Sequence, residues 1–220
     1  MIDATVTIRG DVKIGNGVRI EPYAVLTGPL RIGDDVYIGA HAVIGAPAQH
    51  RGSYPCSLNS PDRGVGVRIK NRACIREFAQ VHQGLTCETI IGEDVLLMAG
   101  AHIAHDSQIG DGATLGSFSI LGGFTIIDEQ ATFGQGVVTH PWTIIGERAM
   151  VGFNSSVVKD VMPFAKVAGA PARLLGSNQH RDDSLPADYD ATMLGANVWE
   201  RWGGLLGQRE DMRKRWTIIA

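Results

Sequence analysis

The chain has 220 residues, of which 44% are hydrophobic, and a net charge of −3 at pH 7. Without a basic excess it gives no sign of a nucleic-acid or anionic-lipid partner. No apolar run approaches the ~18 residues of a membrane span, and the first ten residues lack the basic and apolar regions of a signal peptide. Three cysteines without C-x-x-C spacing argue against a disulfide framework and favour a reduced, cytoplasmic setting.

A six-residue repeat runs through most of the sequence. Hexads such as IGNGVR fill three blocks, residues 2–49, 69–86 and 91–168. Their first residue is nearly always Ile, Leu or Val, the second is often Gly, and the fifth is nearly always Val, Ala, Ser or Thr. A helical period of 3.6 cannot produce this register. The pattern predicts a triangular solenoid with one strand and one turn per hexad, three hexads per coil, and parallel strands about 4.8 Å apart.

Eight, three and thirteen hexads in the three blocks predict eight coils. The Pro-, Gly- and Ser-rich residues 50–68 interrupt the repeat and are expected to form a loop at one corner, and Cys87–Ile90 form a smaller bulge. Insertions in solenoids often build a binding wall.

The hexads stop near the end of the chain, so we expect a solenoid domain over residues 1–177 and a tail over residues 178–220. In the tail, Trp199, Trp202 and Leu206 at helical spacing predict one or two short helices. Such helices would cover the open edge of the last coil.

The repeat resembles the hexapeptide-repeat family. That resemblance implies an all-β fold, a left-handed parallel β-helix with a short helical tail. It also implies a homotrimer, because members of the family are usually trimers with active sites between neighbouring subunits.

The stretch AGAHIAHDSQIGDG, residues 99–112, is the first candidate site. Stacking of the hexads brings His82, His105 and His140 onto one face, with His102 just before it. The cluster is compatible with a metal centre, with a general base, or with a purely structural stack of imidazoles on the sheet.

A zinc site of three histidines, as in carbonic anhydrases that share this fold, needs a ligand five residues before His105, where the chain has Gly100. A general base fits better, because Asp106 can orient the imidazole of His105 and stabilise the imidazolium. No obvious Ser or Cys nucleophile motif is present, which favours direct attack by a bound hydroxyl or amine.

The stretches IGAPAQ, IREFAQVHQG, IGEDVLLMAGAHIAHDSQIGD and VTHPWTIIGERAMVG are similar to those of the UDP-N-acetylglucosamine acyltransferase family of lipid A synthesis. The match covers residues 1–178 and is strongest at 75–160. The resemblance implies acyl transfer from a thioester, on acyl carrier protein or CoA, to a sugar hydroxyl or amine, with no permanently bound cofactor. It implies His105 as general base, Asp106 as its orienting group and the Gly123 N–H as oxyanion donor. The residues expected to bind substrate are His102, His82, Gln83, His140 and Gln49.

The chain departs from the family at four positions. His50 stands where the family has an aspartate that contacts the nucleotide sugar, and Phe124 replaces the histidine that follows the oxyanion glycine. Pro141 replaces a glutamine. Phe153 occupies the position that sets acyl-chain length and is slim in long-chain enzymes, so we expect a short acyl group.

Three other functions stay open. Residues 167–175, VAGAPARLL, look like the ending of hexapeptide acetyltransferases, which favours an amino-sugar N-acetyltransferase that uses acetyl-CoA. A metalloenzyme resembling carbonic anhydrase and a non-catalytic scaffold are the others. The acceptor, nucleotide-linked or an amino sugar, is not fixed by the residues.

Overall fold

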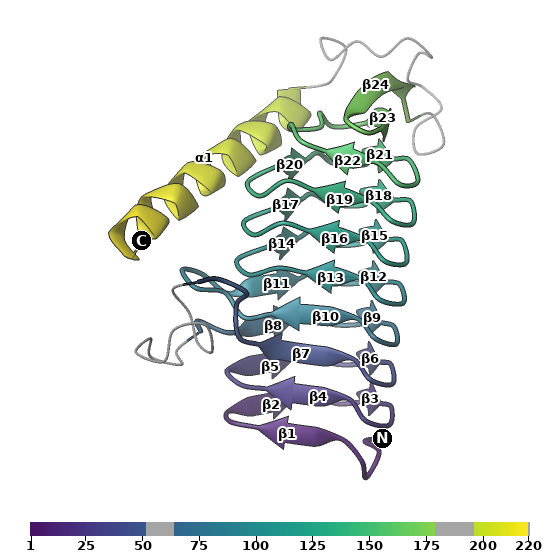
Figure 1. Ribbon diagram of the computed structural model, residues 1–220, viewed down its shortest axis with the longest axis vertical. Helices are drawn as coiled ribbons and strands as arrows, with labels where there is room; N and C mark the ends of the chain where they lie inside the picture. Colours follow the sequence, from purple (N-terminus) through teal and green to yellow (C-terminus); the bar gives the residue numbers. More distant parts are fainter. Residues whose placement is uncertain (52–63, 179–195, 220) are drawn as a thin grey trace.

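The computed structural model describes residues 1–51, 64–178 and 196–219 (Figure 1). Over these residues three parallel sheets form a triangular solenoid, and one α-helix lies along its side. Successive coils wind left-handed from the N-terminal end upward in Figure 1. The predicted left-handed parallel β-helix is confirmed, and the eight strands of the first sheet match the eight predicted coils.

The three sheets, named I, II and III in chain order, contain the following strands. Sheet I consists of β1 (Thr7–Arg9), β4 (Val25–Thr27), β7 (Val43–Ala46), β10 (Gln80–His82), β13 (His102–Ile103), β16 (Ile120–Leu121), β19 (Val138–Thr139) and β22 (Ser156–Val157). Sheet II consists of β2 (Val12–Ile14), β5 (Leu30–Ile32), β8 (Val67–Ile69), β11 (Thr89–Ile91), β14 (Gln108–Ile109), β17 (Ile126–Ile127) and β20 (Ile144–Ile145). Sheet III consists of β3 (Arg19–Ile20), β6 (Tyr37–Ile38), β9 (Cys74–Ile75), β12 (Leu96–Leu97), β15 (Thr114–Leu115), β18 (Thr132–Phe133), β21 (Met150–Val151), β23 (Ala165–Gly169) and β24 (Ala172–Ser177).

The core is built from the first residue of each hexad. In sheet I, for example, Ile103 pairs in register with Val81 below it and Leu121 above it, and all three side chains are buried. Burial of each such side chain contributes about 1.5–3 kcal/mol. The stacked aliphatic residues therefore fix the register of every coil.

The chain turns a corner after each strand, and we name the corners I–II, II–III and III–I after the sheets that they join. The fourth residue of the hexad lies at the corner and commonly adopts a left-handed backbone, with φ of 55° at Asp94, 60° at Asp106 and 59° at Phe118. Asp and Asn tolerate this conformation better than aromatic residues do.

Both interruptions of the repeat open at corner I–II. The first follows β7, and its residues 52–63 lie outside the described part of the chain. The second follows β10 and occupies residues 83–88, slightly earlier than expected, because Thr89 and Ile90 already pair within β11. The two insertions therefore lie on neighbouring coils of the same corner.

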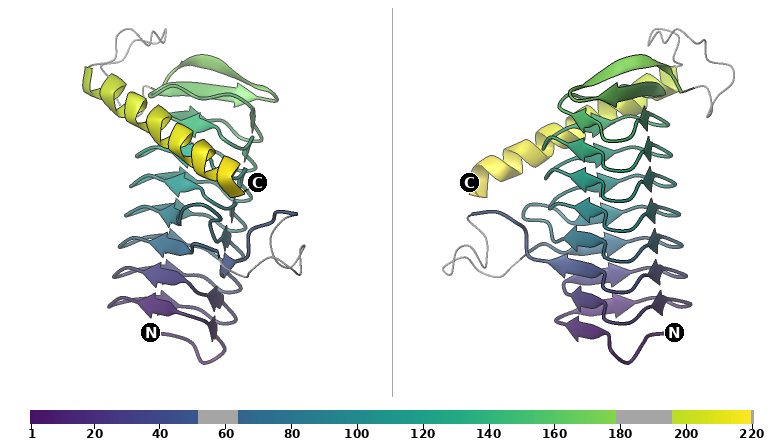
Figure 2. Two further views of the ribbon diagram at one scale, coloured as in Figure 1. Left: turned by 90° about the vertical axis from the view of Figure 1, so that its left-hand side faces the viewer. Right: turned by 45° about the vertical axis from the view of Figure 1, so that its right-hand side comes forward.

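The helix α1 (Ala196–Ile219) runs obliquely along the upper coils (Figure 2). Its Trp202 and Met212 are buried against Phe124, Ile126 and Ile144. The helix thus covers a flank of the solenoid, whereas the antiparallel pair β23–β24 lies at the C-terminal end, where we expected the helices. Among the described residues, no helix combines the length and the apolar character that a membrane crossing requires.

The tail forms a single helix, which continues through Gly203 and Gly204. Both glycines face solvent, with no atom within 4 Å of an added Cβ. Each costs the helix about 1 kcal/mol relative to Ala. Burial of Trp202 and the ion pairs of Arg201 with Asp128 and Glu129 offset that cost.

Candidate active site

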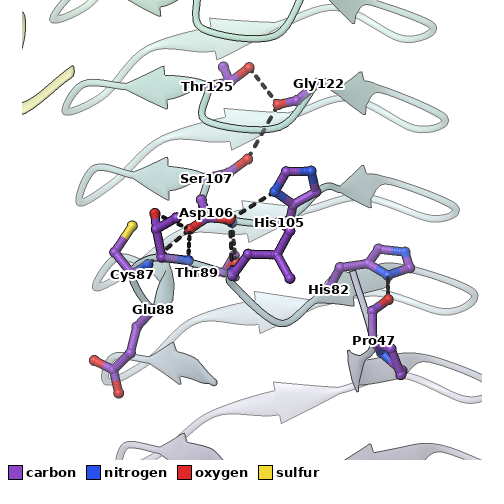
Figure 3. Close-up of polar contacts among 12 residues, drawn as sticks. Pro47, His82, Cys87, Glu88, Thr89, His105, Asp106, Ser107, Gly122 and Thr125 are labelled. Atoms are coloured by element: carbon purple, nitrogen blue, oxygen red, sulfur yellow. Dashed lines mark hydrogen bonds and ion pairs between the residues drawn. The ribbon is translucent and has the colours of Figure 1, made fainter. Parts of the chain in front are cut away.

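His105 and Asp106 lie at corner I–II, between β13 and β14 (Figure 3). His105 Nδ1 is 2.8 Å from Asp106 Oδ2, and the side chains are 12% and 0% exposed. An ionised carboxylate can only accept a hydrogen bond, so Nδ1 carries the proton and donates it. Nε2 of His105 is therefore the nitrogen that can take up a proton from a substrate.

The Asp106 carboxylate is held by the bulge at residues 83–88. Oδ2 accepts a hydrogen bond from the Leu85 N–H, and Oδ1 accepts bonds from the Thr86 N–H, the Thr86 hydroxyl and the Cys87 N–H, all at 2.7–2.9 Å. Burial acts to raise the pKa of Asp106, but these bonds and the bond from His105 outweigh it and hold that pKa below its usual value. Asp106 is therefore charged at neutral pH.

These bonds to Asp106 were not predicted from the sequence. The only signal for them is the four-residue interruption of the hexads, which places extra backbone N–H groups beside the aspartate. Which of those groups point at the carboxylate follows from the fold of the bulge alone.

Gly123 lies one coil above His105 at the same corner. A Cβ at this position would stand 2.7 Å from Cε1 and 2.8 Å from Nε2 of His105. Carbon atoms do not approach ring atoms that closely without displacement. Only glycine leaves the imidazole where Asp106 orients it.

The Gly123 N–H makes no hydrogen bond with any described residue. At corner II–III the N–H of the same hexad position is bonded to a side chain one coil above, as in the 2.7 Å bond from Asn16 to Asp34. Above Gly123 the chain has Pro141, whose side chain has no acceptor. The backbone of Gly123, whose N–H has no partner among the described residues, therefore lies close to the His105 ring. A donor of this type can stabilise an oxyanion.

His82 ends β10, one coil below His105, and His102 begins β13 in the same coil as His105. Their ring centroids are 4.8 Å apart. His82 Nδ1 donates to the Pro47 carbonyl at 2.8 Å, and its buried Nε2 has no partner among the described residues. Burial lowers the pKa of His82, and burial together with the neighbouring His82 lowers the pKa of His102 to about 4. Both rings are neutral at pH 7. Their proposed contact with substrate stays a prediction.

The other expected binding residues are spread around this centre. Gln83 Nε2 donates to the carbonyls of Gly28 and Gly45, so its amide ties coils together. Gln49 is exposed at the start of the first insertion. His140 is exposed two coils above His105, with the coil of Gly123 between them, so it is not on the next level. The binding roles of these residues stay predictions.

Phe153 lies elsewhere on the solenoid. It follows β21 at corner III–I and is 67% exposed. His105 follows β13 at corner I–II, so the width of sheet I separates the two residues. Within one chain, Phe153 does not line a channel that leads to His105.

Aromatic rings cover His105 from above. The Phe124 ring meets the His105 ring edge-on with centroids 5.1 Å apart, and the Trp142 ring stacks on Phe124 at 3.8 Å. His50 lies on another side, at 6.5 Å from His105. The sequence marked Phe124 and His50 as departures from the family but gave no sign of these contacts.

The described residues give little support to a metal site or to a cysteine nucleophile. No group of three or more His, Cys, Asp or Glu in the described part of the chain could hold a metal ion. Burial, with the Asp106 charge, raises the pKa of the Cys87 thiol to about 12, so this thiol is protonated and a poor nucleophile at neutral pH.

Known proteins resemble this chain in sequence. The sequence model of the family described as "Bacterial transferase hexapeptide (six repeats)" matches residues 11–46 and 88–123. The acyl-[acyl-carrier-protein]–UDP-N-acetylglucosamine O-acyltransferase of Anaeromyxobacter sp. (strain K) is 35% identical over 130 residues, which is 58% of this chain and 51% of the relative. Its counterpart from Agrobacterium fabrum is 32% identical over 58% of this chain and 48% of its own.

Solved structures give the same picture. The UDP-N-acetylglucosamine acyltransferase of Bacteroides fragilis superposes with a TM-score of 0.72 and 27% identity, over 84% of this chain and 79% of the other. The enzyme from Campylobacter jejuni also gives a TM-score of 0.72, with 26% identity over 87% and 79% of the two chains. The chain spans about half the length of the curated relatives it matches. The chain carries a six-residue repeat of the kind that this family model describes, and it resembles the UDP-N-acetylglucosamine acyltransferases in sequence and in fold.

Proposed function

We propose that this chain is an acyltransferase that moves a short acyl group from a thioester to a hydroxyl of a nucleotide-linked sugar, with His105 as general base. One observation carries the proposal. An imidazole oriented by a buried carboxylate lies against the backbone of Gly123, whose N–H has no partner among the described residues. A base and an oxyanion donor at one point are what acyl transfer needs.

In the first step, His105 Nε2 takes the proton of the sugar hydroxyl while its oxygen attacks the thioester carbonyl. A C–O bond forms, and the carbonyl oxygen gains negative charge, which the Gly123 N–H stabilises by about 3 kcal/mol. Asp106 stabilises the imidazolium of His105 through Nδ1–H. General base catalysis of this kind contributes about 10²–10⁴-fold.

In the second step, the intermediate collapses and the C–S bond breaks. The leaving thiolate takes the proton from His105 Nε2, which restores the neutral imidazole. The products are a sugar ester and a free thiol, so neither a covalent enzyme intermediate nor a bound cofactor takes part.

The curated relatives suggest the substrates. Their names specify acyl carrier protein as donor and UDP-N-acetylglucosamine as acceptor. We extend both classes to this chain, with acyl-CoA as a second possible donor. The short acyl group rests on Phe153, and that residue can reach the site only from a neighbouring copy.

A homotrimer is part of the proposal. Corner III–I exposes Phe78, Phe118 and Phe153, at 59%, 68% and 67% of their surface. Exposed aromatic residues in a row are typical of protein interfaces. Light scattering should give three times the mass of the chain, and a monomeric mass would contradict the role of Phe153.

A thiol-release assay tests the function. Acyl carrier protein and CoA thioesters of two to fourteen carbons are offered with UDP-N-acetylglucosamine, other nucleotide sugars and free amino sugars. We expect release that depends on a nucleotide sugar, favours short acyl groups and falls about 10³-fold in His105→Ala. Release that needs only a free amino sugar and acetyl-CoA would support N-acetylation instead.

A further inference from the structure

His105, Phe124 and Trp142 belong to three successive coils, and their rings are in contact. Phe124 meets the imidazole edge-on at 5.1 Å between centroids. Trp142 lies parallel to Phe124, at 3.8 Å and an interplanar angle of 2°. We call the rings of Phe124 and Trp142 the aromatic stack. The position of the His105 ring therefore depends on the residues that contact Trp142.

The helix α1 holds Trp142 in three ways. The Arg213 guanidinium lies 5.5 Å from the centroid of the Trp142 ring. Arg209 donates to the Trp142 carbonyl at 3.2 Å and forms an ion pair with Asp160, one coil higher, at 2.7 Å. Met212 is buried in the cluster that includes Phe124, with Trp142 packed against it. The helix therefore fixes the ring, its backbone and the coil above.

Both residues of the stack occupy corner positions with a left-handed backbone. Phe124 and Trp142 have φ of 60° and 69°, in the left-handed region that disfavours aromatic residues. Phe124 is only 3% exposed. Packing of α1 buries the Phe124 ring at this corner.

We propose that α1 and the aromatic stack position the imidazole of His105. The Asp106 carboxylate holds one edge of the ring, Gly123 limits its approach on another side, and Phe124 blocks rotation toward the coil above. When α1 no longer presses Trp142 onto Phe124, the imidazole rotates and Nε2 leaves the Gly123 N–H. Trp142 and Met212 are thus positioning residues, with no contact to the reacting atoms. The consequence for turnover rests on the proposed function, but the consequence for His105 does not.

The direct test is ¹⁵N NMR of the His105 ring in the intact protein, which needs no substrate. In the wild type we expect one tautomer, with the proton on Nδ1. Trp142→Ala should give exchange between tautomers, while Trp142→Phe, which keeps a ring in the stack, should retain one. Met212→Ala, which touches the stack only from α1, should shift the His105 signals in the same direction as Trp142→Ala.

Phe164→Ala is the matched control. Phe164 is also a buried corner aromatic, with φ of 60° and Arg148 over its ring at 5.6 Å, but it lies at corner II–III. It should lower stability without changing the His105 signals. Identical His105 signals in the wild type, Trp142→Ala and Met212→Ala would overturn the proposal.

Kinetics provide the second measurement. Trp142→Ala should lower kcat about tenfold with the acceptor KM within about twofold, because misplacement of a catalytic group affects the chemical step. Trp142→Phe should recover most of the loss. Equal kcat per folded molecule in Trp142→Ala and wild type would also overturn the proposal. If the wild type transfers no acyl group, the proposed function fails, and the NMR spectra still decide the role of the stack.

Discussion

Phe118 and Phe124 are six residues apart and occupy the same place in successive hexads. Their backbones are alike, with φ of 59° and 60°. Their environments are opposite, because Phe118 at corner III–I is 68% exposed and Phe124 at corner I–II is 3% exposed. The repeat fixes the backbone conformation of a corner. The element packed over the corner determines whether its side chains are buried or exposed.

Corners I–II and III–I differ in what covers them. Corner I–II is covered by the bulge at residues 83–88 and by α1, and it holds the buried pair His105–Asp106. At corner III–I the rings of Tyr23, His41 and Phe78 stack at 5.1 and 5.2 Å and stay open to solvent. The first corner is covered by other segments of its own chain, whereas the aromatic rings of the second are exposed.

The largest effect is expected for Asp106→Asn. The amide cannot accept all the bonds from the bulge and His105, so turnover should fall about 10³-fold or more and stability by about 2–4 kcal/mol. Asp94→Asn is the control, since Asp94 has the same hexad position but is 54% exposed in its pair with Arg72. That change should stay within about 0.5 kcal/mol. Rate assays and urea unfolding of the two variants give the comparison, and equal losses would refute it.

The next largest effect is expected for Phe124, and Phe118 provides the comparison at the exposed corner. Phe124→Ala should cost about 3–5 kcal/mol, because it leaves a cavity under α1. Phe118→Ala should change the stability of the folded chain by about 0.5 kcal/mol or less and instead weaken self-association, which light scattering over a dilution series measures. If Phe118→Ala unfolds the chain and leaves its mass unchanged, the two corners do not differ as described.

The pH dependence of stability tests the lowered pKa values of His82 and His102. The folded pKa of His102, about 4, is lower than the value of about 6.5 expected in the unfolded chain, and that of His82 is also lowered. The unfolded chain therefore takes up protons first, and stability falls as the pH drops from about 6.5 toward 4. The His102 contribution is on the order of 1–2 kcal/mol after allowance for its partial exposure. His102→Gln should flatten this part of the stability curve, and an unchanged slope would contradict the assignment.

The smallest effect is expected in the helix that covers corner I–II. Gly203→Ala and Gly204→Ala place a methyl group in open space on α1 and should each stabilise the chain by about 0.5–1 kcal/mol. Gly123→Ala is the contrasting change, because its methyl group meets His105. It should destabilise the chain and lower the rate. Thermal unfolding of the three variants measures the difference in sign.

The parts of the structure that depend on the repeat were predictable from sequence. Ile103, Val81 and Leu121 point inward because each begins a hexad, and the Asp that follows His105 must lie beside it. Contacts that join distant parts of the chain were not predictable. Two examples are the contact of α1 with the Trp142 ring and the hydrogen bond from Thr86 to Asp106. Both depend on how segments outside the repeat pack against the solenoid. The separation of Phe153 at corner III–I from His105 at corner I–II likewise became clear only from the three-dimensional structure.

The most direct test of the account is a crystal structure of the His105→Ala variant with a short-chain acyl thioester bound. We expect the donor to lie at corner I–II, with its carbonyl oxygen accepting a hydrogen bond from the Gly123 N–H. A donor bound with that oxygen away from Gly123, or on another corner, would contradict the assignment of His105 and Gly123 as the catalytic centre.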